Sequence, residues 1–153
     1  ALGVTWFVPE EDRHLKSVSK FKDELCSLLG GWVAEKFFFN DVTTGASSDL
    51  RRATDIAHAM VTEYGMSDEL GLVIFGEKHG QFLGADLSAG KNYSEAIAGK
   101  IDDAVANLID EAKTRTTKLI KDNKALMEKI AESLLKKEVL SKEEFDAFFK
   151  PKK

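Results

Sequence analysis

The sequence has little of what stabilises secreted proteins or anchors membrane proteins. Its 153 residues include one cysteine, Cys26, so no internal disulfide can form, which fits a reducing compartment. Cys26 falls within a predicted helix, where we expect it to pack and not to act as a nucleophile. No apolar run approaches the roughly 18 residues that a membrane-spanning helix needs, and we recognise no signal-peptide pattern. The sequence opens abruptly at Ala1 with an apolar segment, and we therefore expect the chain to be a piece of a longer protein.

Complete catalytic motifs are also missing. The sequence contains no His-Glu-x-x-His zinc motif, no Gly-x-Ser-x-Gly nucleophile elbow and no Gly-x-x-x-x-Gly-Lys phosphate loop. No two of the histidines, His14, His58 and His79, are four residues apart. On one helix, His58 would be rotated by about 900° from Asp49, which places the two on opposite faces. The chain as given therefore has no complete zinc site.

What is present is the composition of an ordinary globular domain. Apolar residues make up 43% of the chain and charged residues 31%, and the length suits one domain with a real core. The formal net charge of −4 argues against nucleic acid as a partner.

Apolar residues recur with the helical period over most of the chain, so we predict a mainly α protein. A small edge strand is expected at Leu2–Val8, stopped by Pro9. We predict one domain over 1–153, with an active-site half (1–66), a loop (67–92) and C-terminal helices (93–153). Helices are expected over 20–37, 48–64, 94–122 and 124–137, followed by a short helix with a Ser141–Glu144 capping box.

The first predicted helix carries two unusual features. Counted at 100° per residue from Phe21, Glu35 falls inside the apolar stripe, and a carboxylate there needs a partner. Without further context, its charge would reach solvent or pair with a lysine. Gly30 and Gly31 each cost the helix roughly 1 kcal/mol relative to alanine. We expect them at a close approach between helices.

The stretch from Thr43 to Leu50 joins the first two long helices and places Asp49 at the start of the second. Taken alone, an aspartate in a first helical turn is explained by capping and by the helix dipole. The wider sequence gives this carboxylate a second interpretation.

A series of short strings, in order and correctly spaced, resembles the C-terminal part of the peptidase domain of the FtsH-type, AAA-linked zinc metalloproteases. The similarity covers almost the whole chain. The strings are Ala1–Thr5, Val8–Arg13, Leu28–Glu35, Val42–Asp49, Met60–Ser67, Phe82–Gly84, Tyr93–Ser94 and Ile101–Asp102.

The resemblance implies a mainly helical protease domain that cleaves proteins with zinc and ATP. Two histidine ligands and a glutamate base would lie upstream, on a helix absent from this chain. Asp49 would be the third metal ligand, and Glu35 would orient a zinc-bound histidine. An edge strand at Gly3, Val4, Thr5 and Trp6 would pair with the backbone of an extended substrate. The sequence departs from the family at Trp32, where arginine is usual, and at Ser48, where asparagine is frequent.

The resemblance also implies a setting for the full-length protein. It would be a membrane-anchored homo- or hetero-hexamer in a cytoplasm-like compartment, bacterial or organellar, that degrades membrane and misfolded soluble proteins. ATP and magnesium would bind in a missing ATPase domain. Zinc would not be fully coordinated in this fragment, which is therefore expected to be inactive.

Two alternatives remain. The protein could be a non-catalytic pseudo-protease subunit of a hexameric ring, although retention of Asp49 argues against a dead site. It could also be a helical interaction module, which fits the amphipathic C-terminal helices but not the ordered family strings. A His-Glu-x-x-His helix encoded upstream of Ala1 would distinguish a protease from both.

Overall fold

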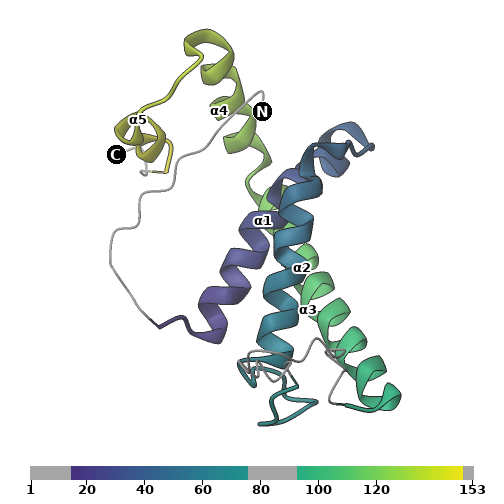
Figure 1. Cartoon of the computed structure of the whole chain (residues 1–153). Coiled ribbons are helices and arrows are strands. Elements are labelled where there is room, and N and C mark those ends of the chain that lie inside the picture. The colour runs from purple at the N-terminus through teal and green to yellow at the C-terminus, as the bar shows by residue number, and fades with distance from the viewer. Residues whose placement is uncertain (1–14, 76–92, 150–153) are drawn as a thin grey trace, which may run out of the picture.

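The computed structural model describes residues 15–75 and 93–149, and all regular structure within these ranges is helical. This confirms the prediction of a mainly α protein. The predicted strand Leu2–Val8 lies outside the described residues. Three long helices form a bundle, and two shorter ones continue from its end (Figure 1). The helices are α1 (Val18–Phe39), α2 (Ser47–Thr62), α3 (Glu95–Asp122), α4 (Lys124–Lys137) and α5 (Lys142–Ala147), with a 3-10 turn, η1 (Thr44–Ala46), before α2.

Local signals fix most of the helix ends. Ser17 and Ser94 begin α1 and α3, where their hydroxyls accept hydrogen bonds from backbone N–H groups three residues on. Asn40 ends α1 in the left-handed region, at φ 52°. The predicted capping box is confirmed, since Ser141 and Glu144 each accept from the other's backbone N–H.

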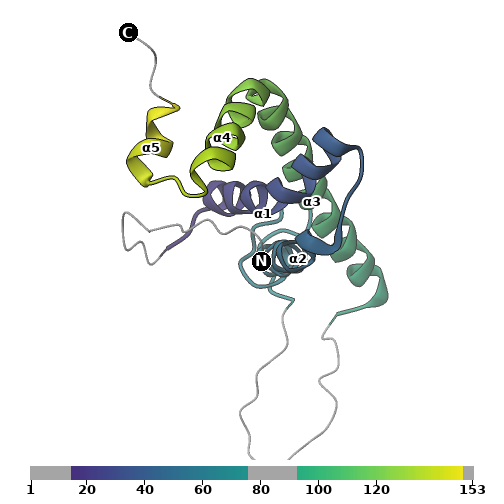
Figure 2. The same cartoon turned by 90° about the horizontal axis from the view of Figure 1, so that it is seen from above.

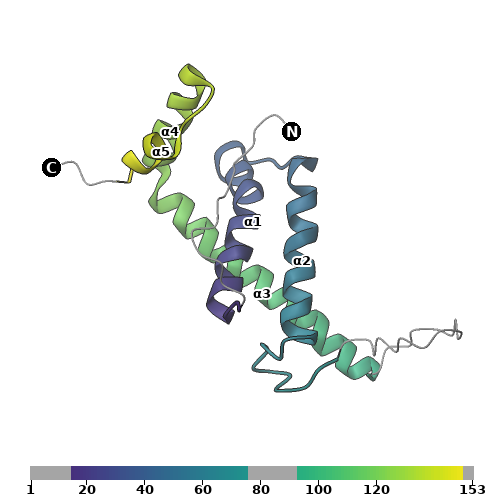
Figure 3. The same ribbon diagram turned by 60° about the vertical axis from the view of Figure 1, so that its left-hand side comes forward.

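The core lies where α1 meets α2 and α3. Figure 3 shows α1 and α2 standing side by side with α3 crossing both. Leu25 of α1 and Met60 of α2 are fully buried there. Alanines at 53, 57 and 112 are also buried, and their small side chains let the helix backbones come close. A smaller cluster of Val61, Leu70, Ile101 and Ala104 joins the end of α2 and the segment after it to the first part of α3.

Two hydrogen bonds between side chains and backbone join α1 to α3 inside this core. The Thr116 hydroxyl donates to the carbonyl oxygen of Cys26 at 3.2 Å. The Cys26 thiol donates to the carbonyl oxygen of Ala112, with sulfur and oxygen 3.7 Å apart. Cys26 is only 8% exposed, which confirms its predicted packing role.

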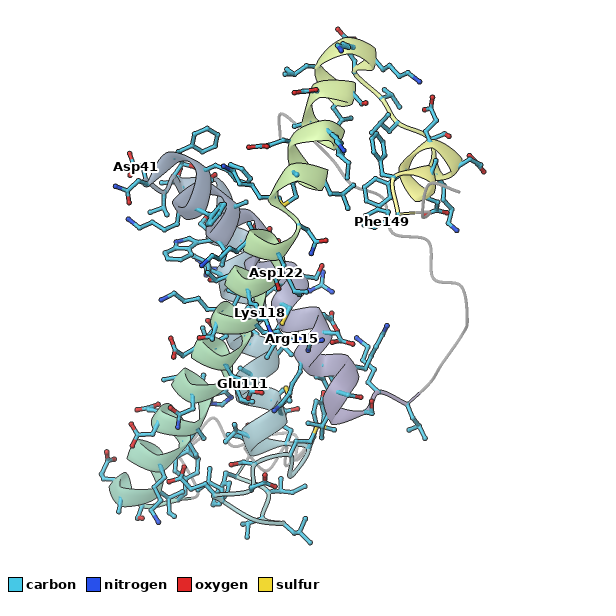
Figure 4. All side chains as sticks on the ribbon, turned by 180° about the vertical axis from the view of Figure 1, so that it is seen from behind. Asp41, Glu111, Arg115, Lys118, Asp122 and Phe149 are labelled. Carbon is cyan, nitrogen blue, oxygen red and sulfur yellow. The ribbon has the colours of Figure 1, made fainter. Side chains whose placement is uncertain are left out.

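Ion pairs at the surface join α1 to both of the other long helices. Glu24 accepts from Lys16 at 2.8 Å and from Arg52 of α2 at 3.0 Å. The hydrogen bond from Lys16, and then the charges of Lys16 and Arg52, hold the pKa of Glu24 below its usual value. From α3, Glu111 and Arg115 reach Lys22 and Asp23 of α1, and both lie on the row of charged residues labelled in Figure 4. Exposed pairs of this kind add little stability each.

The expected close approach at the glycine pair is wrong. In the described part of the chain, a Cβ built on Gly30 or Gly31 would meet no atom within 4 Å apart from its chain neighbours and the nearby backbone of α1. Counted at 100° per residue from Phe21, Gly30 falls near 180° and Gly31 near −80°. Both angles lie outside the predicted apolar stripe. Gly31 is exposed and Gly30 is half-buried, and neither lies at a close approach between described helices.

The last two helices extend beyond the bundle. Seen from above in Figure 2, α4 and α5 lie away from α2. Met127 of α4 contacts the main core, but no described residue of α4 or α5 is buried. Leu135, Val139 and Phe149 are all more than half exposed. Among the described helices, none combines the length and the apolar character that spanning a membrane requires.

Candidate metal-ligand site

The turn between α1 and α2 is held by its own short side chains. After Asn40, the Asp41 carboxylate accepts from the Val42 N–H at 2.8 Å, and Figure 4 places Asp41 at the outer tip of this turn. Thr43 then begins η1, and its hydroxyl oxygen accepts from the Gly45 N–H at 3.2 Å. The chain reverses over these few residues, so α2 starts beside the end of α1.

Asp49 sits in the first turn of α2 and is exposed. The positive end of the helix dipole favours a carboxylate at this position. Within residues 15–75 and 93–149, its carboxylate has no hydrogen bond or ion pair. Both oxygens are therefore available to a ligand that comes from outside the described residues.

Glu35 reaches the same turn from the last part of α1. Its Oε2 accepts from the Thr43 N–H at 2.7 Å, and its Oε1 accepts from the Thr43 hydroxyl at 3.0 Å. The predicted need for a partner is confirmed for this half-buried carboxylate, and the partner is Thr43 and not a lysine. A carboxylate has about four acceptor positions, so Glu35 can still accept another donor. Its role toward a histidine stays a prediction.

The described residues do not form a metal site by themselves. No group of three His, Cys, Asp or Glu side chains converges anywhere in the two described ranges. His58 is exposed on α2, with its Nδ1 3.3 Å from the Thr62 hydroxyl, and His14 and His79 lie outside the described residues. Zinc accepts one carboxylate among its protein ligands, and the free Asp49 fits that part of the set. The other ligands must come from elsewhere.

The predicted substrate strand cannot be placed. Gly3, Val4, Thr5 and Trp6 all lie outside the described residues, so their role also stays a prediction. Trp32 packs against the core, and the ammonium nitrogen of Lys113 lies 5.7 Å from the centre of its ring. A tryptophan therefore suits a position that ties α1 to α3.

Thr43 is the residue that sequence reasoning missed. A hydroxyl residue two positions before Gly45 signals a side-chain-capped turn. Nothing in the sequence says that the same hydroxyl would donate to Glu35, because this depends on how α1 and α2 meet.

Comparisons with known proteins agree on one family. The profile of Peptidase family M41 matches residues 1–148. A protein of Thermoanaerobacter sp. named ATP-dependent zinc metalloprotease FtsH 1 is 47% identical over 96% of this chain and 24% of its own length. Proteins named ATP-dependent zinc metalloprotease FtsH are 47% identical in Caldicellulosiruptor bescii and 45% in Rubrobacter xylanophilus, each over 94% of this chain and 23% and 22% of their own lengths. The chain thus spans about a quarter of the length of these curated relatives.

Proposed function

Because the chain belongs to peptidase family M41, we propose that it forms part of an ATP-dependent zinc metalloendopeptidase. The relatives' names support this activity. The observation that carries the proposal is the exposed, unpartnered carboxylate of Asp49 at the start of α2. A carboxylate with no partner in the described part of the chain is available to a metal that other residues also bind.

In this proposal, Asp49 is one of three protein ligands of a catalytic zinc. Two histidines of a His-Glu-x-x-His helix, absent from this sequence, complete the set. The zinc that Asp49 and the two histidines would hold would supply a Lewis acid and an activated water for peptide hydrolysis. Glu35 accepts a hydrogen bond from one of the histidines and orients it. The backbone of Gly3, Val4, Thr5 and Trp6 pairs with the extended substrate.

The proposal extends to the whole protein. ATP and magnesium bind in a separate ATPase domain, and the complete protein is a membrane-anchored hexamer in a cytoplasm-like compartment. Its substrates are membrane proteins and misfolded soluble proteins. These 153 residues alone are inactive, because they lack two of the three zinc ligands and the glutamate base.

Replacing Asp49 tests the ligand assignment. In the full-length protein, we expect Asp49→Ala to abolish zinc-dependent proteolysis, because two histidines alone hold zinc poorly. ATP hydrolysis should remain largely intact. The measurements are degradation of an unfolded protein substrate, zinc content and ATPase rate.

Asp55→Ala is the matched control, since Asp55 is another exposed aspartate of α2, placed on a different face. It should keep both activities. Normal proteolysis by Asp49→Ala would overturn the ligand assignment.

A second candidate function is a non-catalytic subunit or helical interaction module of a hexameric ring. The exposed apolar side chains Leu135, Val139 and Phe149 favour it, because they are available to a partner. The two candidates differ in metal content. A full-length protein that binds no zinc, and whose gene encodes no His-Glu-x-x-His helix, would support the second.

A further inference from the structure

Glu35 and Thr43 form a two-point contact across the turn that leads to α2. Glu35 is half-buried on α1, and it engages both donors of Thr43, the backbone N–H at 2.7 Å and the hydroxyl at 3.0 Å. Hydrogen bonds to a charged acceptor are stronger than bonds between neutral groups. Two of them on one residue fix both its position and its orientation.

The start of α2 has no side-chain cap of its own. Its N-cap position is Ala46, which has no side-chain group to accept a hydrogen bond. The backbone N–H of Ser47 instead donates to the carbonyl oxygen of Thr44 inside η1. The first turn of α2, which carries Asp49, therefore takes its position from η1, and η1 begins at Thr43.

Two residues of η1 lie close to this contact or are buried beside it. A Cβ on Gly45 would lie 3.2 Å from the Thr43 hydroxyl oxygen and 3.8 Å from Glu35 Oε1. Ala46 is only 6% exposed, although the residues on both sides of it are exposed. A path of hydrogen bonds thus runs from α1 through Glu35, Thr43 and η1 to Ser47, in the helical turn that carries Asp49.

We propose that Glu35 is a positioning residue that holds η1 through Thr43 and thereby presets the place of Asp49 in the metal site. The proposal rests on the ligand role of Asp49 proposed above. An exposed aspartate on a freely moving turn would lose conformational freedom each time metal binds, whereas a held turn has lost it during folding. Residues that orient metal ligands typically contribute about 10–100-fold to metal affinity.

The test uses the full-length protein with zinc, because the site is complete only there. Thr43→Val removes the hydroxyl and leaves Glu35 free to accept other donors. We expect this variant to bind zinc about tenfold more weakly, at the lower end of that range, because the backbone N–H bond to Glu35 remains. Thr43→Ser restores the hydroxyl and should return the affinity to that of the wild type. Zinc affinity is measured by competition with a chelator.

Thr117→Val is the matched control, because the Thr117 hydroxyl is exposed and donates only to Lys113 of its own helix. A second measurement, hydrogen exchange of the zinc-free protein, needs no metal. The Gly45 amide, which donates to the Thr43 hydroxyl, should exchange faster in Thr43→Val and normally in Thr43→Ser.

Asp49→Ala, measured in parallel, separates the two ideas. Weak zinc binding by Asp49→Ala together with wild-type binding by Thr43→Val would overturn the positioning role and leave the proposed function standing. Unchanged zinc binding by Asp49→Ala would overturn the proposed function, and with it any influence of Glu35 on the metal. Weak binding by both variants, with Thr117→Val and Thr43→Ser unaffected, is the expected result.

Discussion

Three glycines of the α1–α2 hairpin are under different constraints. A Cβ on Gly30 or Gly31 would meet no described atom within 4 Å, and both residues lie inside α1. Gly65, which follows α2, has a φ of +60°, where a side chain is strained even though space is available. The two glycines in α1 therefore weaken the helix without serving its packing, whereas Gly65 serves the turn.

Replacing these glycines should shift stability in opposite directions. We expect Gly30→Ala to raise the free energy of unfolding by up to about 1 kcal/mol, because alanine restricts the unfolded chain and favours a helix. Gly65→Ala should lower it by roughly 1–2 kcal/mol, the cost of a left-handed backbone with a side chain. Urea unfolding followed by circular dichroism measures both. A destabilised Gly30→Ala would mean that another surface packs against this face of α1.

Two residues of the candidate site could be identified from the sequence, and one could not. Asp49 could be identified because it lies in an ordered series of family strings, and Glu35 because a carboxylate on an apolar stripe needs a partner. The identity of that partner could not be predicted. Thr43 donates to Glu35 only because α2 folds back beside α1, and the angle of that return is set by packing and not by local sequence.

At the scale of the elements, α1 and α3 are joined by buried hydrogen bonds as well as by apolar contacts. Thr116 of α3 is 4% exposed, and its hydroxyl donates to the carbonyl oxygen of Cys26 in α1. Thr54, in contrast, donates to Leu50 of its own helix and is exposed. The two threonines have similar hydrogen bonds in different surroundings.

This contrast gives a test of the α1–α3 interface. Thr116→Val should lower the free energy of unfolding by about 1 kcal/mol, because a net hydrogen bond between helices is lost while the shape is kept. Thr54→Val should change it by less than about 0.5 kcal/mol, as expected for an exposed position. The measurement is again urea unfolding. Equal effects of the two substitutions would mean that the bond from Thr116 adds nothing to the interface.

Most of the helices could be predicted because their signals are local. The apolar period and the serines at 17, 94 and 141 lie within or beside each helix, and the observed ends fall within about two residues of the predicted ones. The surroundings of Gly30 and Gly31 could not be predicted in this way, because the glycines carry no side chain that would mark a contact with another helix.

At the scale of the whole molecule, burial is unevenly distributed. The described core residues come from α1, η1, α2, α3 and the segment after α2, whereas α4 and α5 contribute none that are buried. The chain therefore combines a packed bundle with an extension that has few contacts to it. Regions with few buried contacts open at a lower free energy than the core.

Native-state hydrogen exchange should detect this difference. We expect amides in the middle of α1, α2 and α3 to be the most protected and those of α4 beyond Met127 to exchange at least roughly tenfold faster. The first turn of α4 is an internal control with intermediate protection, because Met127 contacts the main core. Equal protection along α3 and α4 would contradict a bundle with a weakly held extension.

The contact between Glu35 and Thr43 also bears on how this architecture can change in evolution. Both of its residues belong to the α1–α2 hairpin, and they are eight positions apart in the sequence. Among the residues between α2 and α3 that the structure describes, none takes part in this contact. Loop-closure entropy grows slowly with length, by about 0.6 kcal/mol for each doubling of the number of residues. Insertions and deletions between α2 and α3 can therefore accumulate in descendants of this chain while the aspartate keeps its place.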